Sequence, residues 1–77
     1  MNNTNTHAIA ILGCGRISES HVKAIEATEG LRLAACCDVI LERANALAEK
    51  TGCTPYVDSA EMLARPDIEL VALCTPS

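Results

Sequence analysis

The 77-residue sequence is short of aromatic residues and contains no long apolar run. It has neither Phe nor Trp and only one Tyr, at position 56, so its hydrophobic core has to be aliphatic. No stretch reaches the roughly 18 uninterrupted apolar residues of a membrane-spanning helix. Residues 1–7 also lack the basic and then apolar pattern of a signal peptide. We therefore expect a cytoplasmic protein with no part in a membrane.

Basic residues are scarce as well. Six Lys and Arg stand against ten Asp and Glu, which gives a formal net charge of −4. The basic residues are scattered singly, so they do not form the patch that binds a nucleic-acid backbone or an anionic lipid surface. We expect neither nucleic acid nor a membrane as a partner. The length leaves room for one small domain.

The cysteines lack the spacing of a metal site or a disulfide framework. None is in C-x-x-C spacing, and no His lies at a ligand-like offset from any of them. We interpret them as reduced thiols, four of which serve as small buried hydrophobic residues. The exception is Cys14, because a helix that begins there would stabilise its thiolate and make it oxidisable. The five residues are Cys14, Cys36, Cys37, Cys53 and Cys74.

The most informative feature is a buried-strand pattern at residues 7–12 that leads directly into a glycine turn, Gly13 to Ser18. Gly13 allows a backbone conformation that a Cβ would obstruct, and the missing side chain of Gly15 lets the backbone approach phosphate oxygens. The helix that follows points its unpaired N–H groups at an anion. Ser18 stands where Gly or Ala is typical of a G-x-G-x-x-G motif. We expect this departure to affect how the following helix packs and not how the turn binds a dinucleotide.

Four apolar segments alternate with three helical patterns. Residues 7–12, 31–37, 54–57 and 68–74 predict strands, the last apolar enough for a central strand. Residues 16–28, 41–51 and 58–65 predict helices, with Gly30 and Gly52 after the first two and Asp58 as the N-cap of the third. The short connections favour right-handed crossovers and a parallel sheet.

We therefore predict an α/β fold with a Rossmann-type parallel sheet in strand order 3-2-1-4. The first two helices would cover one face and the third would cover only part of the other. That bare face predicts that residues 7–77 are the incomplete N-terminal portion of a larger dinucleotide-binding domain. Residues 1–6 form a polar leader that we expect to be disordered.

The apolar stripes of the helices indicate which side chains enter the core. In the first helix Val22 and Ile25 share a stripe that also includes His21, and in the second the stripe includes Leu41 and Leu47. Because this stripe lies away from the carboxyl ends of strands one and four, we interpret His21 as a packed or capping residue rather than a catalytic base.

Asp38 follows the second predicted strand, 20 positions beyond Ser18, and completes the pattern of a dinucleotide site. A carboxylate there accepts hydrogen bonds from the adenosine ribose hydroxyls and repels a 2′-phosphate, which favours NAD over NADP. Arg43, about one helical turn onward, could reach a phosphate, but we interpret it as a solvated residue of the second helix. Thr75 and Ser77 follow strand four, where their hydroxyls are either ribose contacts or ordinary strand-exit residues.

Taken together, the glycine turn at 13–18, His21, the Cys37-Asp38 pair and residues 73–77 make the chain similar to the N-terminal domain of the Gfo/Idh/MocA family over residues 8–77. The resemblance implies an NAD(P)-dependent oxidoreductase that acts on a sugar, inositol or related polyol. It also implies a second α+β domain that binds substrate and mediates homo-oligomers. The implied cofactor-binding residues are Gly13, Cys14, Gly15, Arg16, Ile17, Asp38, Thr75, Pro76 and Ser77.

The family's Glu-Lys-Pro segment and its later Asp and His would lie beyond Ser77, so no catalytic residue and no metal ligand is assigned. We expect hydride transfer between a carbinol carbon and the nicotinamide, with a base outside this segment taking the hydroxyl proton. Two alternatives remain: a non-enzymatic nucleotide-sensing Rossmann module, and a different NAD(P)-dependent reductase that shares only the fold.

Overall fold

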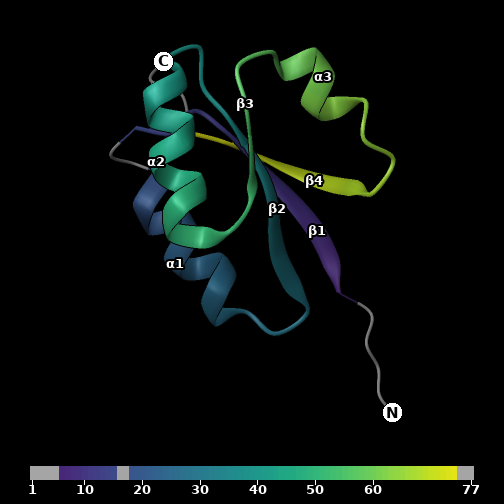
Figure 1. Cartoon of the computed structure of the whole chain (residues 1–77). Coiled ribbons are helices and arrows are strands. Elements are labelled where there is room, and N and C mark those ends of the chain that lie inside the picture. The colour runs from purple at the N-terminus through teal and green to yellow at the C-terminus, as the bar shows by residue number, and fades with distance from the viewer. Residues whose placement is uncertain (1–5, 16–17, 75–77) are drawn as a thin grey trace.

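The computed structural model describes residues 6–15 and 18–74, which form a single four-stranded sheet with three helices (Figure 1). Strands and helices alternate along the chain as the sequence predicts. The elements are β1 (His7–Leu12), α1 (Ser18–Ala27), β2 (Leu31–Cys37), α2 (Leu41–Thr51), β3 (Thr54–Tyr56), α3 (Ser59–Leu63) and β4 (Ile68–Leu73).

All strand pairs are parallel, and the order β3-β2-β1-β4 confirms the predicted topology. Helices α1 and α2 lie together on one face of the sheet, and α3 lies on the other (Figure 1). Because every strand runs the same way, the carboxyl ends of β1 and β2 meet at one edge, where Leu12 pairs with Cys37. The loops that follow these two strands are therefore neighbours.

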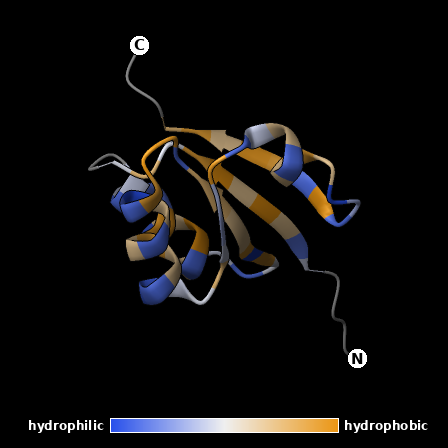
Figure 2. Ribbon diagram, turned by 45° about the horizontal axis from the view of Figure 1, so that its top comes forward, coloured by the Kyte–Doolittle hydropathy of each residue, from blue (hydrophilic) through white to orange (hydrophobic). Residues whose placement is uncertain are grey.

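The core consists of two aliphatic clusters, one on each face of the sheet. The larger lies under α1 and α2 and includes Ile11, Val22, Ile25 and Leu47. The smaller lies under α3, where Met62 is fully buried against alanines and Cys37 of the sheet. Apolar residues line the strands, and the polar positions of α1 and α2 face outward (Figure 2). This arrangement confirms the expectation of an aliphatic core.

The helix ends follow the predicted local signals. Gly52 adopts a left-handed conformation with φ of 81°, and its N–H donates to the carbonyl of Ala48 at 2.7 Å. This ends α2 as a glycine after the last turn is expected to do. Asp58 caps α3, because its side chain accepts a 2.9 Å hydrogen bond from the N–H of Ala60.

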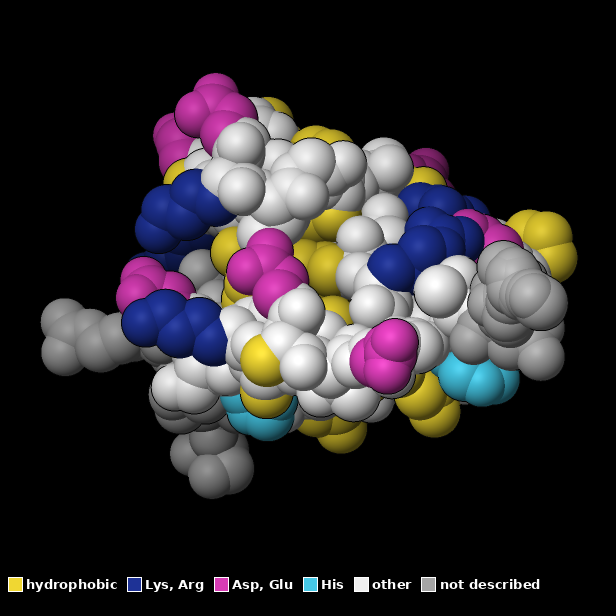
Figure 3. Space-filling view, turned by 90° about the horizontal axis from the view of Figure 1, so that it is seen from below, with side chains coloured by type: hydrophobic (Ala, Val, Ile, Leu, Met, Phe, Trp, Pro, Cys, Tyr) yellow, Lys and Arg dark blue, Asp and Glu magenta, His cyan; other side chains and the backbone are white. Residues whose placement is uncertain are grey.

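Two expectations about exposure are wrong. His21 and Leu41 do not face the core: both are exposed, since the buried stripes are narrower than the apolar pattern suggested. Both histidine side chains are at the surface (Figure 3). Strand β4 lies at the edge of the described sheet, as the order 3-2-1-4 requires, and Leu70 and Leu73 are exposed along it.

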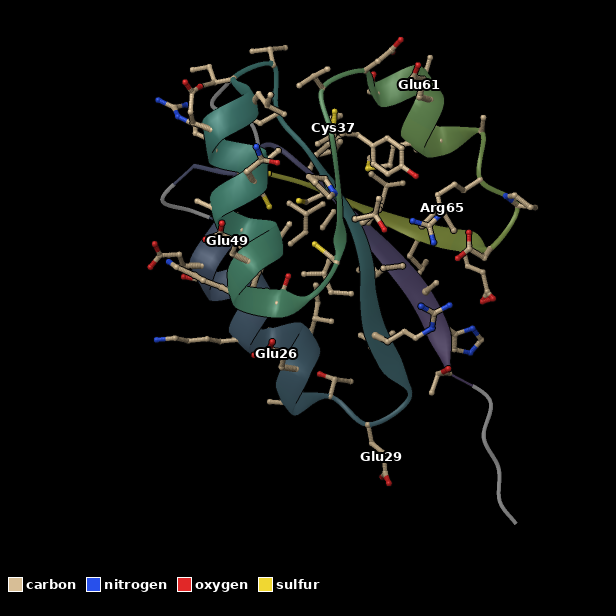
Figure 4. The ribbon with its side chains drawn as sticks, viewed as in Figure 1. Glu26, Glu29, Cys37, Glu49, Glu61 and Arg65 are labelled. Atoms are coloured by element: carbon tan, nitrogen blue, oxygen red, sulfur yellow. The ribbon has the colours of Figure 1, made fainter. Side chains whose placement is uncertain are left out.

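An ion-pair network ties the α3–β4 connection to the sheet. Arg65 binds Asp67 through two hydrogen bonds of 2.7 and 3.0 Å and donates a third, of 3.3 Å, to the carbonyl of Ala34 in β2. Its guanidinium reaches back from the α3 side toward the strands (Figure 4). Arg32 approaches the same carboxylate at 3.6 Å. These contacts tie the start of β4, which pairs with β1, to the more distant strand β2. Within residues 6–15 and 18–74, no helix has the length and apolar character needed to cross a membrane.

Candidate functional site

The glycine turn is held by main-chain hydrogen bonds to the end of β2. Gly13 has φ of 101°, a left-handed conformation that favours glycine, and its N–H donates to the carbonyl of Cys37 at 2.7 Å. Ser18 closes the turn, since its hydroxyl and its N–H both bond to the carbonyl of Gly15, at 2.6 and 3.1 Å. Ser18 is buried as the first residue of α1, and its hydroxyl has a hydrogen-bond partner there.

Asp38 joins the two loops at this edge of the sheet. One oxygen, Oδ2, accepts a 2.9 Å hydrogen bond from the N–H of Cys14, and the other, Oδ1, accepts one of 2.8 Å from the N–H of Ile40. The residue is only 9% exposed, so its carboxylate is held in one orientation. A carboxylate has about four lone-pair sites, and two remain for hydroxyl donors.

A hollow of about 220 Å³ opens beside Asp38. We call it the Asp38 hollow. It has apolar walls and one carboxylate, which suits a flat base joined to a hydroxylated sugar. Its lining residues are Leu12, Gly13, Cys37, Asp38, Val39, Ile40, Arg43, Val57 and Ser59.

A second hollow of about 310 Å³ lies between the glycine turn, the start of α1 and α2. We call it the turn groove; its lining residues are Cys14, Gly15, Ser18, Glu19, Arg43, Ala46, Leu47 and Lys50. A Cβ built on Gly15 would meet no atom within 4 Å, so the turn presents bare backbone to open space. Such a surface is what an approaching phosphate group requires.

Among residues 6–15 and 18–74, Arg43 is the one that lines both hollows. It belongs to the first turn of α2, and no carboxylate in the described part of the chain pairs with its guanidinium. Arg43 is exposed, in agreement with its interpretation as a solvated residue, and it also borders both hollows.

The Cys14 thiol is not activated, contrary to the sequence-based expectation. Burial and the neighbouring Asp38 carboxylate raise its pKa to about 11, although a hydrogen bond with Cys36 works in the opposite direction. Helix α1 begins at Ser18, four positions later, so Cys14 does not occupy the helix terminus that would stabilise a thiolate. The other four cysteines are buried, as predicted, and all five are free.

The structure brings four of the predicted cofactor residues together: Gly13, Cys14, Gly15 and Asp38 surround the two hollows. The predicted residues Arg16, Ile17, Thr75, Pro76 and Ser77 lie outside the described part of the chain. Val57, which follows β3, and Ser59, the first residue of α3, were not predicted. The strand order 3-2-1-4 was the available signal, because it places the end of β3 beside Asp38.

Sequence comparison decides the family. Residues 7–77 match the Gfo/Idh/MocA oxidoreductase family with its NAD-binding Rossmann fold. The chain belongs to this family. It is an NAD-binding Rossmann portion of a Gfo/Idh/MocA oxidoreductase, and the glycine turn and Asp38 occupy the places that such a fold uses for a dinucleotide.

Individual relatives agree with this assignment. Inositol 2-dehydrogenase of Rhizobium meliloti is 37% identical over 73 residues, which are 94% of this chain and 22% of the relative. The WlbA dehydrogenase of Chromobacterium violaceum, solved with NADH and UDP-GlcNAcA, aligns with a TM-score of 0.89 and 32% identity over 99% of this chain and 22% of that one. A 3-ketoreductase variant of Actinomadura kijaniata, solved with NADP, aligns with a TM-score of 0.86 and 25% identity. The alignment covers 94% of this chain and 23% of that one.

The chain thus spans 22% of the length of the inositol dehydrogenase that it matches. The structural neighbours include proteins solved with NADH and with NADP. The family therefore establishes a nicotinamide dinucleotide as the ligand class, and the choice between the two cofactors has to be argued from Asp38 and its surroundings.

Proposed function

We propose that the protein is a dehydrogenase that uses NAD in preference to NADP and acts on a sugar, inositol or related polyol. The family membership and the inositol dehydrogenase relative support the substrate class. The observation that carries the cofactor preference is the fixed Asp38 carboxylate at the wall of its hollow. The bound nicotinamide supplies the hydride acceptor or donor.

The residues of this chain bind and orient the cofactor. The adenosine ribose lies in the Asp38 hollow, where its hydroxyls donate to the two remaining lone-pair sites of the carboxylate. The pyrophosphate lies against the bare backbone of Gly15 and faces the start of α1. Arg43, between the two hollows, contributes a positive charge to the phosphates.

We further propose that Arg16 and Ile17 flank the pyrophosphate and that Thr75, Pro76 and Ser77 line the groove of the nicotinamide half. The base that takes the hydroxyl proton of the substrate comes from a part of the protein outside this sequence. The surface that assembles a homo-oligomer is also proposed to come from a part of the protein outside this sequence. A further part of the proposal is that the protein acts in the cytoplasm.

Titration of the full-length protein with NADH and NADPH tests the cofactor preference. Tighter binding of NADH supports the role of Asp38, because a carboxylate and a 2′-phosphate at one place repel each other. Tighter binding of NADPH contradicts it. A screen with NAD and a panel of inositols, aldoses and nucleotide sugars then tests the activity, since a nucleotide-sensing module would bind the cofactor without reducing it.

A further inference from the structure

One polar side chain of the Asp38 hollow has no part in the proposed contacts to ribose and phosphate. Apart from the thiol of Cys37, the polar side chains that line this hollow are those of Asp38, Arg43 and Ser59. In the proposed complex Asp38 binds the ribose and Arg43 lies near the phosphates. Ser59 is the uncharged member of this set, and it comes from a different loop than the other two.

The hydroxyl of Ser59 differs from other hydroxyls at helix ends in having no partner in the fold. The hydroxyls of Ser18, Thr28 and Thr51 each donate to a main-chain carbonyl three or four residues earlier. Within residues 6–15 and 18–74, the hydroxyl of Ser59 makes no hydrogen bond to the protein. Ser59 is half-buried. Its hydroxyl is therefore available to a ligand that enters the hollow.

The wall that carries Ser59 is fixed on both sides of this residue. Before it, the N–H of Asp38 donates to the carbonyl of Tyr56 at 3.0 Å, which joins the ends of β2 and β3. After it, the cap by Asp58 and the fully buried Met62 hold α3 on the sheet. A hydroxyl on such a wall binds a ligand without the entropic cost of ordering a loop.

Adenine is the part of the proposed ligand whose chemistry suits this hydroxyl. The faces of the base are apolar, as are the side chains of Val39 and Val57 that line the hollow. The edge of the base carries an amino donor and ring-nitrogen acceptors, which need partners once the base has left water. The carboxylate of Asp38 only accepts and the guanidinium of Arg43 only donates, whereas a hydroxyl does both.

We propose that Ser59 binds the edge of the adenine base through its hydroxyl. This inference rests on the proposed function, because it takes the adenosine half of the cofactor as the ligand of the Asp38 hollow. Removal of the hydroxyl deletes about one neutral hydrogen bond, which corresponds to a roughly three- to tenfold loss of affinity. The fold loses no hydrogen bond within the described ranges, so we expect its stability to stay close to that of the wild type.

The test compares adenosine monophosphate with ribose 5-phosphate, which has the same sugar and phosphate but no base. Neither ligand carries a 2′-phosphate, so the comparison does not depend on the choice between NAD and NADP. Ligand-observed NMR measures the affinity of full-length wild type and Ser59→Ala for both, and calorimetry measures NADH. The matched control is Ser20→Ala, because Ser20 is an exposed serine near the start of α1 and lines neither hollow.

We expect Ser59→Ala to bind adenosine monophosphate and NADH roughly three- to tenfold more weakly, with unchanged affinity for ribose 5-phosphate. Its urea unfolding should match the wild type, and Ser20→Ala should match it throughout. The inference is overturned if Ser59→Ala keeps wild-type affinity for adenosine monophosphate. It is also overturned if the affinities for both small ligands fall equally, because the effect would then lie on the sugar, the phosphate or the fold.

Failure of the proposed function has a different signature. A wild type that prefers NADPH would contradict the proposed cofactor preference, while the comparison of the two small ligands would still decide the role of Ser59. A wild type that binds neither NADH nor adenosine monophosphate would contradict the proposed function and this inference together.

Discussion

The main-chain N–H of Cys14 donates a hydrogen bond of 2.9 Å to Oδ2 of Asp38. This bond links the glycine turn after β1 to the end of β2, and the second carboxylate oxygen is held by the N–H of Ile40. Asp38 therefore has two tasks. It positions the turn, and it presents the carboxylate that faces the ribose in the proposed complex. The two tasks are separable by substitution.

Replacement of Asp38 by Ala should lower both stability and affinity. Two partly buried N–H groups lose their acceptor, which costs roughly 1–3 kcal/mol of the free energy of unfolding. Asp38→Asn keeps one amide oxygen, so its loss of stability should be smaller, while its discrimination against NADPH should fall because the charge is gone. Denaturant unfolding and calorimetric titration with both cofactors measure the two effects. An Asn variant with undiminished preference for NADH would contradict the electrostatic role of Asp38.

The two glycines of the turn should respond differently to Ala. Gly13 has a positive φ of 101°, so Gly13→Ala should destabilise the fold by about 1 kcal/mol or more. The new methyl of Gly15→Ala meets no atom within 4 Å, so this variant should fold with nearly wild-type stability and bind NADH at least several-fold more weakly, because the methyl occupies the space of the phosphate. Thermal unfolding and NADH titration distinguish the loss of stability in Gly13→Ala from the loss of affinity in Gly15→Ala. Wild-type affinity in a folded Gly15→Ala protein would place the phosphates elsewhere.

Substitution of Arg43 should weaken the binding of the phosphate-bearing part of the cofactor. Arg43→Gln removes the positive charge between the two hollows, and we expect NADH and ADP to bind several-fold more weakly while adenosine is unaffected. The matched control is Arg32→Gln, whose guanidinium lies beside Asp67 in the network that holds β4. Equal effects of Arg43→Gln on adenosine and ADP would show that the residue acts on the fold and not on the phosphates.

The α3 side of the core should depend on a single side chain. Met62 is fully buried against the sheet, and Met62→Ala should lower the free energy of unfolding by roughly 2–5 kcal/mol. The adjacent Leu63 is 50% exposed, so Leu63→Ala should change it by well under about 1 kcal/mol. Urea unfolding of both variants measures the contrast. Similar losses would mean that α3 packs through another face.

Acid should weaken the network at the start of β4. Arg65 hydrogen-bonds with Asp67 and lowers the pKa of that carboxyl below its ordinary value of 3.8. Because the folded pKa is the lower one, the contribution of Asp67 to stability is complete above the ordinary value and is lost as the pH falls through the folded pKa. In urea unfolding across this pH range, the stability difference between wild type and Asp67→Asn should shrink on the acid side. Glu29→Gln, at an exposed position that points away from the molecule (Figure 4), is the control variant for the loss of one carboxylate.

The sequence predicts the elements and their order well because the signals are local. Gly52 and Asp58 mark helix ends through their own backbone and side-chain chemistry, and the apolar segments mark the strands. Exposure is less well predicted. His21 and Leu41 fit an apolar stripe by spacing, yet both are exposed, because the width of the buried stripe depends on how each helix sits on the sheet.

Contacts between distant segments depend on the register of the strands, for which the sequence carries no local signal. The bond from Ile40 to Asp38 is a local side-chain turn and was predictable from an Asp two positions earlier. The bond from Cys14 to the same carboxylate depends on the pairing of Leu12 with Cys37. This contact has no signal in the spacing of the residues.

The most direct measurement is a crystal structure of the full-length protein with NAD bound. The account predicts the pyrophosphate within hydrogen-bonding distance of main-chain N–H groups of the glycine turn, and the adenosine ribose hydroxyls on the carboxylate of Asp38. A pyrophosphate bound away from Gly13 and Gly15, or a ribose with no contact to Asp38, would contradict it.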